Sequence, residues 1–114
     1  MMKKQNNIVL IGMPGVGKST LGVVLAKVLG FQFLDSDLLI QEQEGRKLSR
    51  IIEEEGYKGF QKIEDRVNAS IDVIHTVIAT GGSVVYCKEA MEHLKKIGTI
   101  VYLHVSLEEL QKRL

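Results

Sequence analysis

Short apolar runs alternate along the chain with longer stretches that carry an apolar residue at every third or fourth position. Four runs, at residues 8–11, 31–34, 76–80 and 99–105, have the length and composition of strands. A continuous run of Val, Ile and Leu is typical of a parallel strand that is buried on both faces. The chain is therefore expected to alternate strands with helices.

The stretches between these runs predict the helices. After the first run, one helical face collects a set of apolar residues, namely Leu21, Val24, Leu25, Val28 and Leu29. Gly30 follows where a helix often ends on a left-handed residue. The other expected helices run from Leu38 to near Gly45, from Leu48 to Gly56, from about Tyr57 to Ile74, through Met91 to Gly98, and onward from a capping box at 106–109.

A glycine-rich loop joins the first run to the first helix and fits the pattern G-x-x-x-x-G-K-[ST]. Glycines let successive backbone N–H groups turn inward toward phosphate oxygens. Lys18 can reach the β- and γ-phosphates of a nucleotide, and the Ser19 hydroxyl can bind Mg²⁺. The helix that begins here directs the positive end of its dipole at the same anion. The predicted nucleotide-binding residues are Gly12, Gly15, Val16, Gly17, Lys18, Ser19 and Thr20.

Two aspartates, Asp35 and Asp37, follow the second run directly. Residues i and i+2 of an extended segment point the same way, so both carboxylates are expected to face one crevice. Ligands of open parallel sheets bind at the carboxyl ends of the strands. Asp35 is the carboxylate best placed to support Mg²⁺, and Asp37 can orient a substrate hydroxyl or accept its proton. Either aspartate can instead cap the next helix, which does not exclude such a role.

Gly81 and Gly82 follow the third run. Paired glycines after a buried strand let a ligand approach the backbone closely, although a tight turn explains them equally well. The acidic run at 53–55 is expected to be a solvated helix face rather than a site.

Composition narrows the classes of function. The 114 residues suggest one domain, and a net charge of +1 indicates neither a nucleic acid nor a membrane surface as partner. The first apolar run is too short for a signal peptide or a spanning helix. The single cysteine, Cys87, allows no intramolecular disulfide, and no pair of histidines has the spacing of zinc ligands. We therefore expect a cytoplasmic, monomeric protein.

Four features, taken with their spacing, resemble the shikimate kinase family over essentially the whole chain. They are Gly12-x₄-Gly17-Lys18-Ser19-Thr20, Asp35-Ser36-Asp37, Gly56-x₃-Phe60-x₃-Glu64 and Thr80-Gly81-Gly82. The resemblance implies a phosphate-loop, nucleoside-monophosphate-kinase type of fold, with three α/β/α layers around a parallel sheet. It also implies transfer of the ATP γ-phosphoryl group to the 3-hydroxyl of shikimate, in chorismate and aromatic amino acid biosynthesis.

The same resemblance implies roles for individual residues. The glycine-rich loop would hold the ATP phosphates, Ser19 would bind Mg²⁺, and Asp35 would support the metal directly or through water. Asp37 would hydrogen-bond the shikimate hydroxyls and position the attacking one, so that Lys18 and Asp37 are the expected catalytic residues. The glycine pair at 81–82 would present backbone N–H groups to the substrate. Positioning and charge neutralisation are the main needs of phosphoryl transfer.

Gln61 departs from the family pattern, which has an arginine there that binds the shikimate carboxylate. An amide cannot make the bidentate charged contact of arginine, and losing that contact costs on the order of 2–4 kcal/mol. Of the neighbouring cations, Lys62 and Arg66 are expected on other helical faces than Gln61, which leaves Lys58. Two alternatives therefore stay open: a kinase of this fold for another small hydroxyl substrate, and a nucleotide-binding protein without transferase activity.

Length is the second departure. The resemblance implies that a lid, the adenine-side residues, a second carboxylate-binding arginine and a fifth strand follow residue 114. Residues 1–114 are therefore expected to be a single phosphate-loop kinase domain, incomplete at its C-terminus. A lid excludes water and supplies charge in the transition state, so these residues alone are expected to bind nucleotide weakly and to turn over little.

Overall fold

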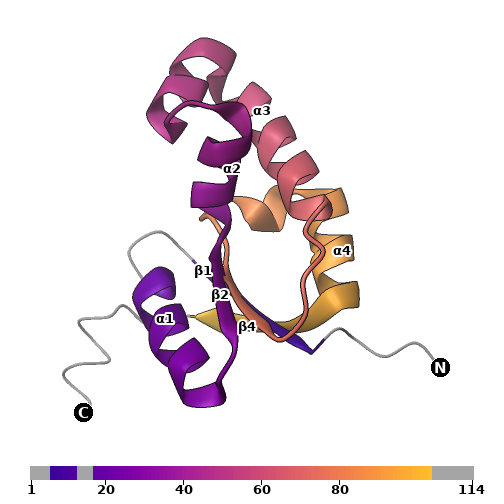
Figure 1. Cartoon of the computed structure of the whole chain (residues 1–114). Coiled ribbons are helices and arrows are strands. Elements are labelled where there is room, and N and C mark those ends of the chain that lie inside the picture. Colours follow the sequence, from indigo (N-terminus) through magenta and orange to yellow (C-terminus); the bar gives the residue numbers. More distant parts are fainter. Residues whose placement is uncertain (1–5, 13–16, 104–114) are drawn as a thin grey trace.

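The computed structural model describes residues 6–12 and 17–103, in which strands and helices alternate (Figure 1). The elements are β1 (Asn7–Gly12), α1 (Lys18–Leu29), β2 (Gln32–Asp35), α2 (Ser36–Glu44), α3 (Leu48–Ala69), β3 (Thr76–Ala79), the short 3₁₀ helix η1 (Val84–Tyr86), α4 (Lys88–Ile97) and β4 (Gly98–Leu103). The four described strands are parallel and lie in the order β2-β3-β1-β4. The expected α/β fold with a parallel sheet is confirmed.

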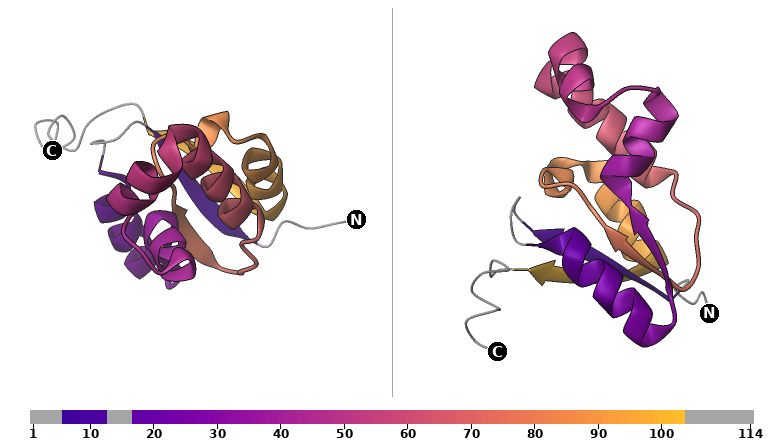
Figure 2. Two further views of the ribbon diagram at one scale, coloured as in Figure 1. Left: turned by 90° about the horizontal axis from the view of Figure 1, so that it is seen from above. Right: turned by 60° about the vertical axis from the view of Figure 1, so that its left-hand side comes forward.

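Helices cover both faces of the sheet, as Figures 1 and 2 show. On one face, α1 closes a core around Leu10, Ala26 and Val77. On the other face, α4 closes a core that contains Val9 and Leu94. Val9 and Leu10 are neighbours on β1 and lie in different cores, because successive strand residues point to opposite faces. The continuous apolar run of β1 therefore serves two cores, as expected of a central parallel strand.

The buried face of α1 differs from the predicted one. Gly22 and Ala26 are buried against the sheet, whereas Val24 and Val28 are 54% and 77% exposed. A Cβ atom on Gly22 would lie 2.6 Å from a ring carbon of Phe33. Small residues therefore let α1 approach the sheet closely. The spacing of apolar residues predicted the helix correctly but did not predict which face of it is buried.

The breaks around α2 and α3 follow glycines. Gly45 ends α2 with φ 69°, and Gly56 interrupts α3 with φ 74° and ψ 172°. Both lie in the left-handed range of φ that favours glycine, so the predicted boundaries at Gly45 and Gly56 are confirmed. The second half of α3 ends at Ala69 instead of Ile74, and Ile74 is 61% exposed in the connection to β3.

We call residues 36–56, which comprise α2 and the first half of α3, the arm. The arm extends away from the sheet (Figures 1 and 2). It shares a small core with the second half of α3, formed by Ile40, Ile51, Phe60 and Val67. No helix within 17–103 combines the length and apolar character that crossing a membrane requires. The predicted capping box at 106–109, the helix after it and His104 lie outside the described residues.

Candidate active site at the carboxyl edge of the sheet

A cavity of about 370 Å³ lies where the segments that follow the parallel strands come together. Three elements line it: the start of α1, the start of α2 and the segment after β3. Its lining residues are Gly17, Lys18, Ser19, Thr20, Asp37, Thr80, Gly81 and Gly82. A larger hollow of about 590 Å³, along residues 45–54 of the arm, shares none of them. The fold thus joins three segments that the sequence singled out separately.

Lys18 is the first residue of α1 and is only 8% exposed. Its Nζ donates a hydrogen bond to the Gly12 carbonyl oxygen at 2.7 Å, across the loop. Burial lowers the pKa of Lys18, and the nearby Asp37 carboxylate opposes that shift. Lys18 therefore forms part of the cavity wall at the N-terminal end of α1. The predicted loop residues Gly15 and Val16 lie outside the described residues.

Asp35 links α1 to α2. Its Oδ2 accepts a hydrogen bond from the Ser19 hydroxyl at 2.9 Å, and its Oδ1 accepts from the N–H groups of Asp37 and Leu38 at 3.0 and 3.2 Å. Asp35 is therefore the N-cap of α2, which starts at Ser36 rather than at Leu38. The expected extended geometry at residues 35–37 is wrong, because Asp37 lies in the first turn of the helix.

Asp37 nevertheless reaches the cavity from that first turn. Burial raises the pKa of its carboxyl, the Asp35 carboxylate adds to this shift, and the Lys18 ammonium partly offsets it. A carboxylate with a raised pKa is a better proton acceptor near neutral pH than an ordinary one. Asp37 thus lines the same cavity as Lys18, and its carboxyl has a raised pKa.

Glu64, to which sequence reasoning gave no role, lies behind Gly81, one of the residues that line the cavity. It lies on α3, is 1% exposed, and its Oε1 accepts a hydrogen bond from the Ser83 hydroxyl at 2.6 Å. Burial raises the pKa of its carboxyl. The available signal was the spacing, because Glu64 falls between Phe60 and Val67 on the buried face of the helix.

Gln61 lies outside this cavity, in a neighbouring hollow of about 280 Å³ that Lys58, Lys62 and Tyr86 also line. Lys62, which is expected on a different helical face from Gln61, borders the same hollow. Arg66 points elsewhere and donates to Glu44 at 2.7 Å.

The side chains of Cys87 and His93 lie among structural groups. Cys87 is buried, and its pKa is raised to about 12, mainly by burial. His93 lies 2.6 Å from the Ile71 carbonyl oxygen through its Nε2. In the part of the chain that the structure describes, no group of three or more His, Cys, Asp or Glu residues is arranged to hold a metal ion.

A parallel α/β sheet with a phosphate-loop lysine at its carboxyl edge defines the phosphate-loop nucleoside-triphosphate-binding class. The family model for shikimate kinase matches residues 14–114. A shikimate kinase from Actinobacillus succinogenes is 43% identical over 107 residues, which are 93% of this chain and 61% of that protein. The chain belongs to the shikimate kinase family.

Solved structures agree with this assignment. The shikimate kinase from Acinetobacter baumannii in complex with shikimate matches with a TM-score of 0.82 at 39% identity, over 95% of this chain and 61% of that one. The shikimate kinase from Aquifex aeolicus matches with a TM-score of 0.76 at 34% identity, over 91% of this chain and 62% of that one. The chain thus spans 61–62% of the length of these relatives.

Proposed function

We propose that this protein transfers the γ-phosphoryl group of ATP to the 3-hydroxyl of shikimate. Family membership supports the reaction class. The observation that carries the proposal is the shared cavity, in which Lys18 of α1 lies with Asp37 of α2 and Gly81 after β3. A phosphate-binding cation and a candidate proton acceptor therefore face one space large enough for reacting groups.

On the nucleotide side, Lys18 and the backbone amides of the loop bind the phosphates. The residues present also fit Mg²⁺, because the hydroxyl of Ser19, which lines the cavity, and the Asp35 carboxylate behind it supply hard oxygen donors 2.9 Å apart. Mg²⁺ keeps several waters and phosphate oxygens as ligands, so one or two protein groups suffice. When bound, the ion neutralises charge on the phosphate oxygens.

On the acceptor side, Asp37 orients the hydroxyl. The hydroxyl oxygen forms a bond to the γ-phosphorus, the bond from that phosphorus to the ADP oxygen breaks, and the hydroxyl proton passes to Asp37. Burial of Asp37 favours this proton transfer, because it raises the pKa of the carboxyl. Gly81 and Gly82 line the same cavity and offer backbone N–H groups to the acceptor without side chains in the way.

The acceptor carboxylate is the part of the substrate most affected by Gln61. Lys58, Lys62 and Asp65 share the hollow of Gln61, so a carboxylate bound there meets two ammonium groups and one carboxylate rather than a guanidinium. Ammonium groups attract a carboxylate as point charges and lack the bidentate geometry of arginine. We therefore retain another small hydroxylated acid as the second candidate acceptor.

The direct test compares phosphorylation of shikimate, gluconate and nucleoside monophosphates by the protein with ATP and Mg²⁺. We expect phosphorylated shikimate to form, slowly if residues 1–114 are used alone, and a Lys18→Met variant to form roughly 100-fold less. If gluconate were the only acceptor phosphorylated, another small hydroxylated acid would replace shikimate as the proposed acceptor. Binding of Mg·ATP without product from any acceptor would leave a nucleotide-binding protein without transferase activity.

We also propose that the protein acts as a cytoplasmic monomer. The chain has a single cysteine, Cys87, which is buried, so the described fold needs no disulfide, as is usual in a reducing compartment. Size-exclusion chromatography with light scattering and cell fractionation test the two parts separately.

A further inference from the structure

A buried hydroxyl group lies where β3 leads into the glycine pair. Thr80 follows the last residue of β3, lines the candidate site and is only 4% exposed. Its Oγ1 donates a hydrogen bond to the Leu10 carbonyl oxygen at 2.7 Å, and its backbone N–H donates to the same oxygen at 3.2 Å. The backbone bond continues the parallel ladder in which Leu10 pairs with Ala79. The hydroxyl therefore adds a second bond that the ladder does not require.

The carbonyl group that Thr80 binds belongs to the strand that leads into the phosphate loop. Leu10 lies two residues before Gly12, the last residue of β1. The Gly12 carbonyl oxygen accepts a hydrogen bond from Nζ of Lys18 at 2.7 Å. Thr80 and Lys18 both line the site, one on the acceptor side and the other on the nucleotide side. The end of β1 therefore connects the two sides of the site through two carbonyl groups.

The glycine pair at 81–82 has no side chains that could fix its position. Beyond the pair, the Ser83 hydroxyl ties the chain to α3 by its bond to Glu64. Before the pair, Thr80 ties the chain to β1. A displacement of about 1 Å between reacting groups can lower the rate of an enzymatic step roughly 100-fold. The bond to β1 is thus expected to affect the transfer step more than the binding of either substrate.

We infer that Thr80 is a positioning residue: its hydroxyl holds the segment of Gly81 and Gly82 against Leu10 and so sets the distance between the acceptor and the phosphates. The inference rests on the proposed function, in which the glycine pair binds the acceptor and Lys18 binds the phosphates. It assigns Thr80 an effect on phosphoryl transfer that passes through these residues.

Kinetics of the protein with ATP and shikimate test the positioning role. Thr80→Val removes the hydroxyl and keeps a β-branched side chain. It should lower kcat roughly tenfold, while KM for shikimate and KM for ATP each change by less than about twofold. Leu10 keeps its bond from the backbone N–H, so its carbonyl oxygen stays satisfied and the variant should fold. Thr80→Ser restores the hydroxyl and should recover most of kcat.

Thr76→Val is the matched control. Thr76 is the first residue of β3, is 3% exposed and donates through Oγ1 to the Ile74 carbonyl oxygen at 2.8 Å. The control loses a similar buried bond at the opposite end of the same strand, so it should lower Tm about as much as Thr80→Val and leave kcat unchanged. The inference is overturned if kcat is unchanged in Thr80→Val, if it falls equally in the control, or if Thr80→Ser is as slow as Thr80→Val.

Amide hydrogen exchange tests the contact without any need for activity. We expect the Gly81 amide to exchange at least about threefold faster in Thr80→Val than in the unmodified protein, and at the unmodified rate in Thr76→Val. Equal exchange in all three proteins would contradict the inference. If the unmodified protein phosphorylates no acceptor, the proposed function fails, while the exchange rates still decide whether Thr80 holds the glycine pair in place.

Discussion

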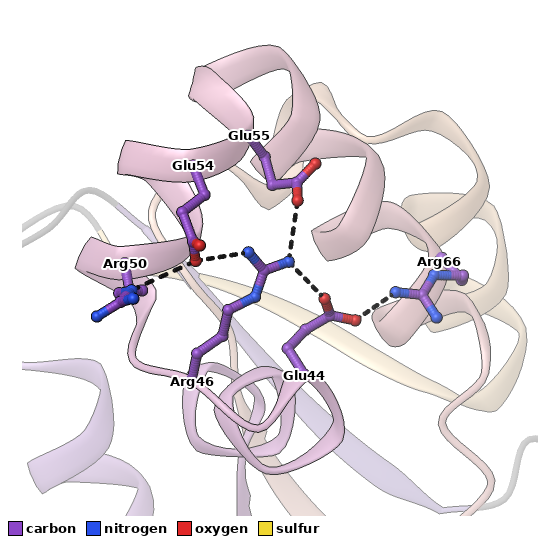
Figure 3. Close-up of polar contacts among 6 residues, drawn as sticks. All are labelled: Glu44, Arg46, Arg50, Glu54, Glu55 and Arg66. Carbon is purple, nitrogen blue, oxygen red and sulfur yellow. Dashed lines mark hydrogen bonds and ion pairs between the residues drawn. The ribbon is translucent and has the colours of Figure 1, made fainter.

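The arm and the candidate site each contain several carboxylates, but their surroundings shift the pKa values of these groups in opposite directions. In the arm, Arg46 donates to Glu44, Glu54 and Glu55 at 3.0, 3.0 and 3.1 Å (Figure 3). Glu44 also accepts from Arg66, so the network ties the end of α2 to both halves of α3. These hydrogen bonds to arginine lower the pKa of Glu44 and raise that of Arg46.

At the site, burial raises the pKa of both Asp37 and Glu64. Only Asp37 has a cation among the groups that shift its pKa, and that cation is Lys18. Charges that are paired and partly exposed fix the orientation of helices at little cost. Charges that are buried without a matching partner are costly, and proteins retain them mainly where a ligand or a proton uses them. The comparison separates the buried carboxyls beside the proposed site from those whose ion pairs connect the helices of the arm.

The largest expected effect follows removal of the cation from the site. Lys18→Met should reduce phosphoryl transfer by roughly 100-fold or more, because the phosphates lose their buried positive charge. Lys27→Met, in the last turn of the same helix, is the matched control and should behave like the unmodified protein. Steady-state kinetics and calorimetric titration with Mg·ATP measure both. If Lys18→Met were as active as the unmodified protein, the reaction would not use the buried charge of the site, and the contrast with the paired charges of the arm would fail.

A methyl group on Gly81 should have the next largest effect. The new Cβ meets carboxyl oxygens of Asp37 and Glu64 at 2.7 Å each, so Gly81→Ala should destabilise the fold by about 1–3 kcal/mol and weaken acceptor binding. Urea denaturation measures the loss of stability.

A second substitution checks the cause of that loss. Glu64→Ala in the Gly81→Ala background should recover part of the stability, because the double variant relieves one of the two close contacts. Fully additive losses would show that the glycine acts through something other than these carboxyls.

The pH dependence of stability should distinguish the two clusters further. The folded-state pKa of Glu64 is raised, so its favourable contribution is complete below about pH 4.3, the ordinary value in an unfolded chain. That contribution is lost as pH rises toward the folded-state pKa, because the unfolded chain releases a proton that the folded chain retains. Thermal denaturation from about pH 4 to 8 should therefore show the unmodified protein losing stability relative to Glu64→Gln. If the stability of the unmodified protein and that of Glu64→Gln changed in parallel with pH, the raised pKa of Glu64 would be contradicted.

Local patterns predicted most of the fold, because the buried strands, the glycine helix ends and the phosphate loop depend on short stretches of chain. The solvated acidic run at 53–55 was also predicted correctly, since its residues are exposed. Of two errors, the start of α2 came from a local contact, because Asp35 caps the helix, and the buried face of α1 came from a tertiary contact, because Gly22 faces Phe33. Glu64 was missed for the same kind of reason. Spacing placed Glu64 on the buried face of α3, but its proximity to Ser83 and Gly81 depends on how α3 meets the segment after β3.

The smallest expected effect lies in the arm. Arg46→Gln removes three ion pairs, yet its partners Glu54 and Glu55 keep 45% and 43% of their side-chain surface exposed. Water replaces most of what the guanidinium supplied. Tm should therefore fall only slightly, by less than in Gly81→Ala, and the difference should nearly vanish at about 1 M salt, where screening acts within a few ångström.

Arg50→Gln is the control for this variant, because Arg50 is 68% exposed and makes one pair at 3.5 Å with Glu54. It should change Tm even less, and neither variant should alter KM for shikimate. A rise in that KM with Arg46→Gln would show that the network sets the angle of α3 across the break at Gly56. The arm would then be coupled to Glu64 through the second half of the same helix, and the division between the paired carboxylates of the arm and the buried carboxyls beside the site would no longer hold.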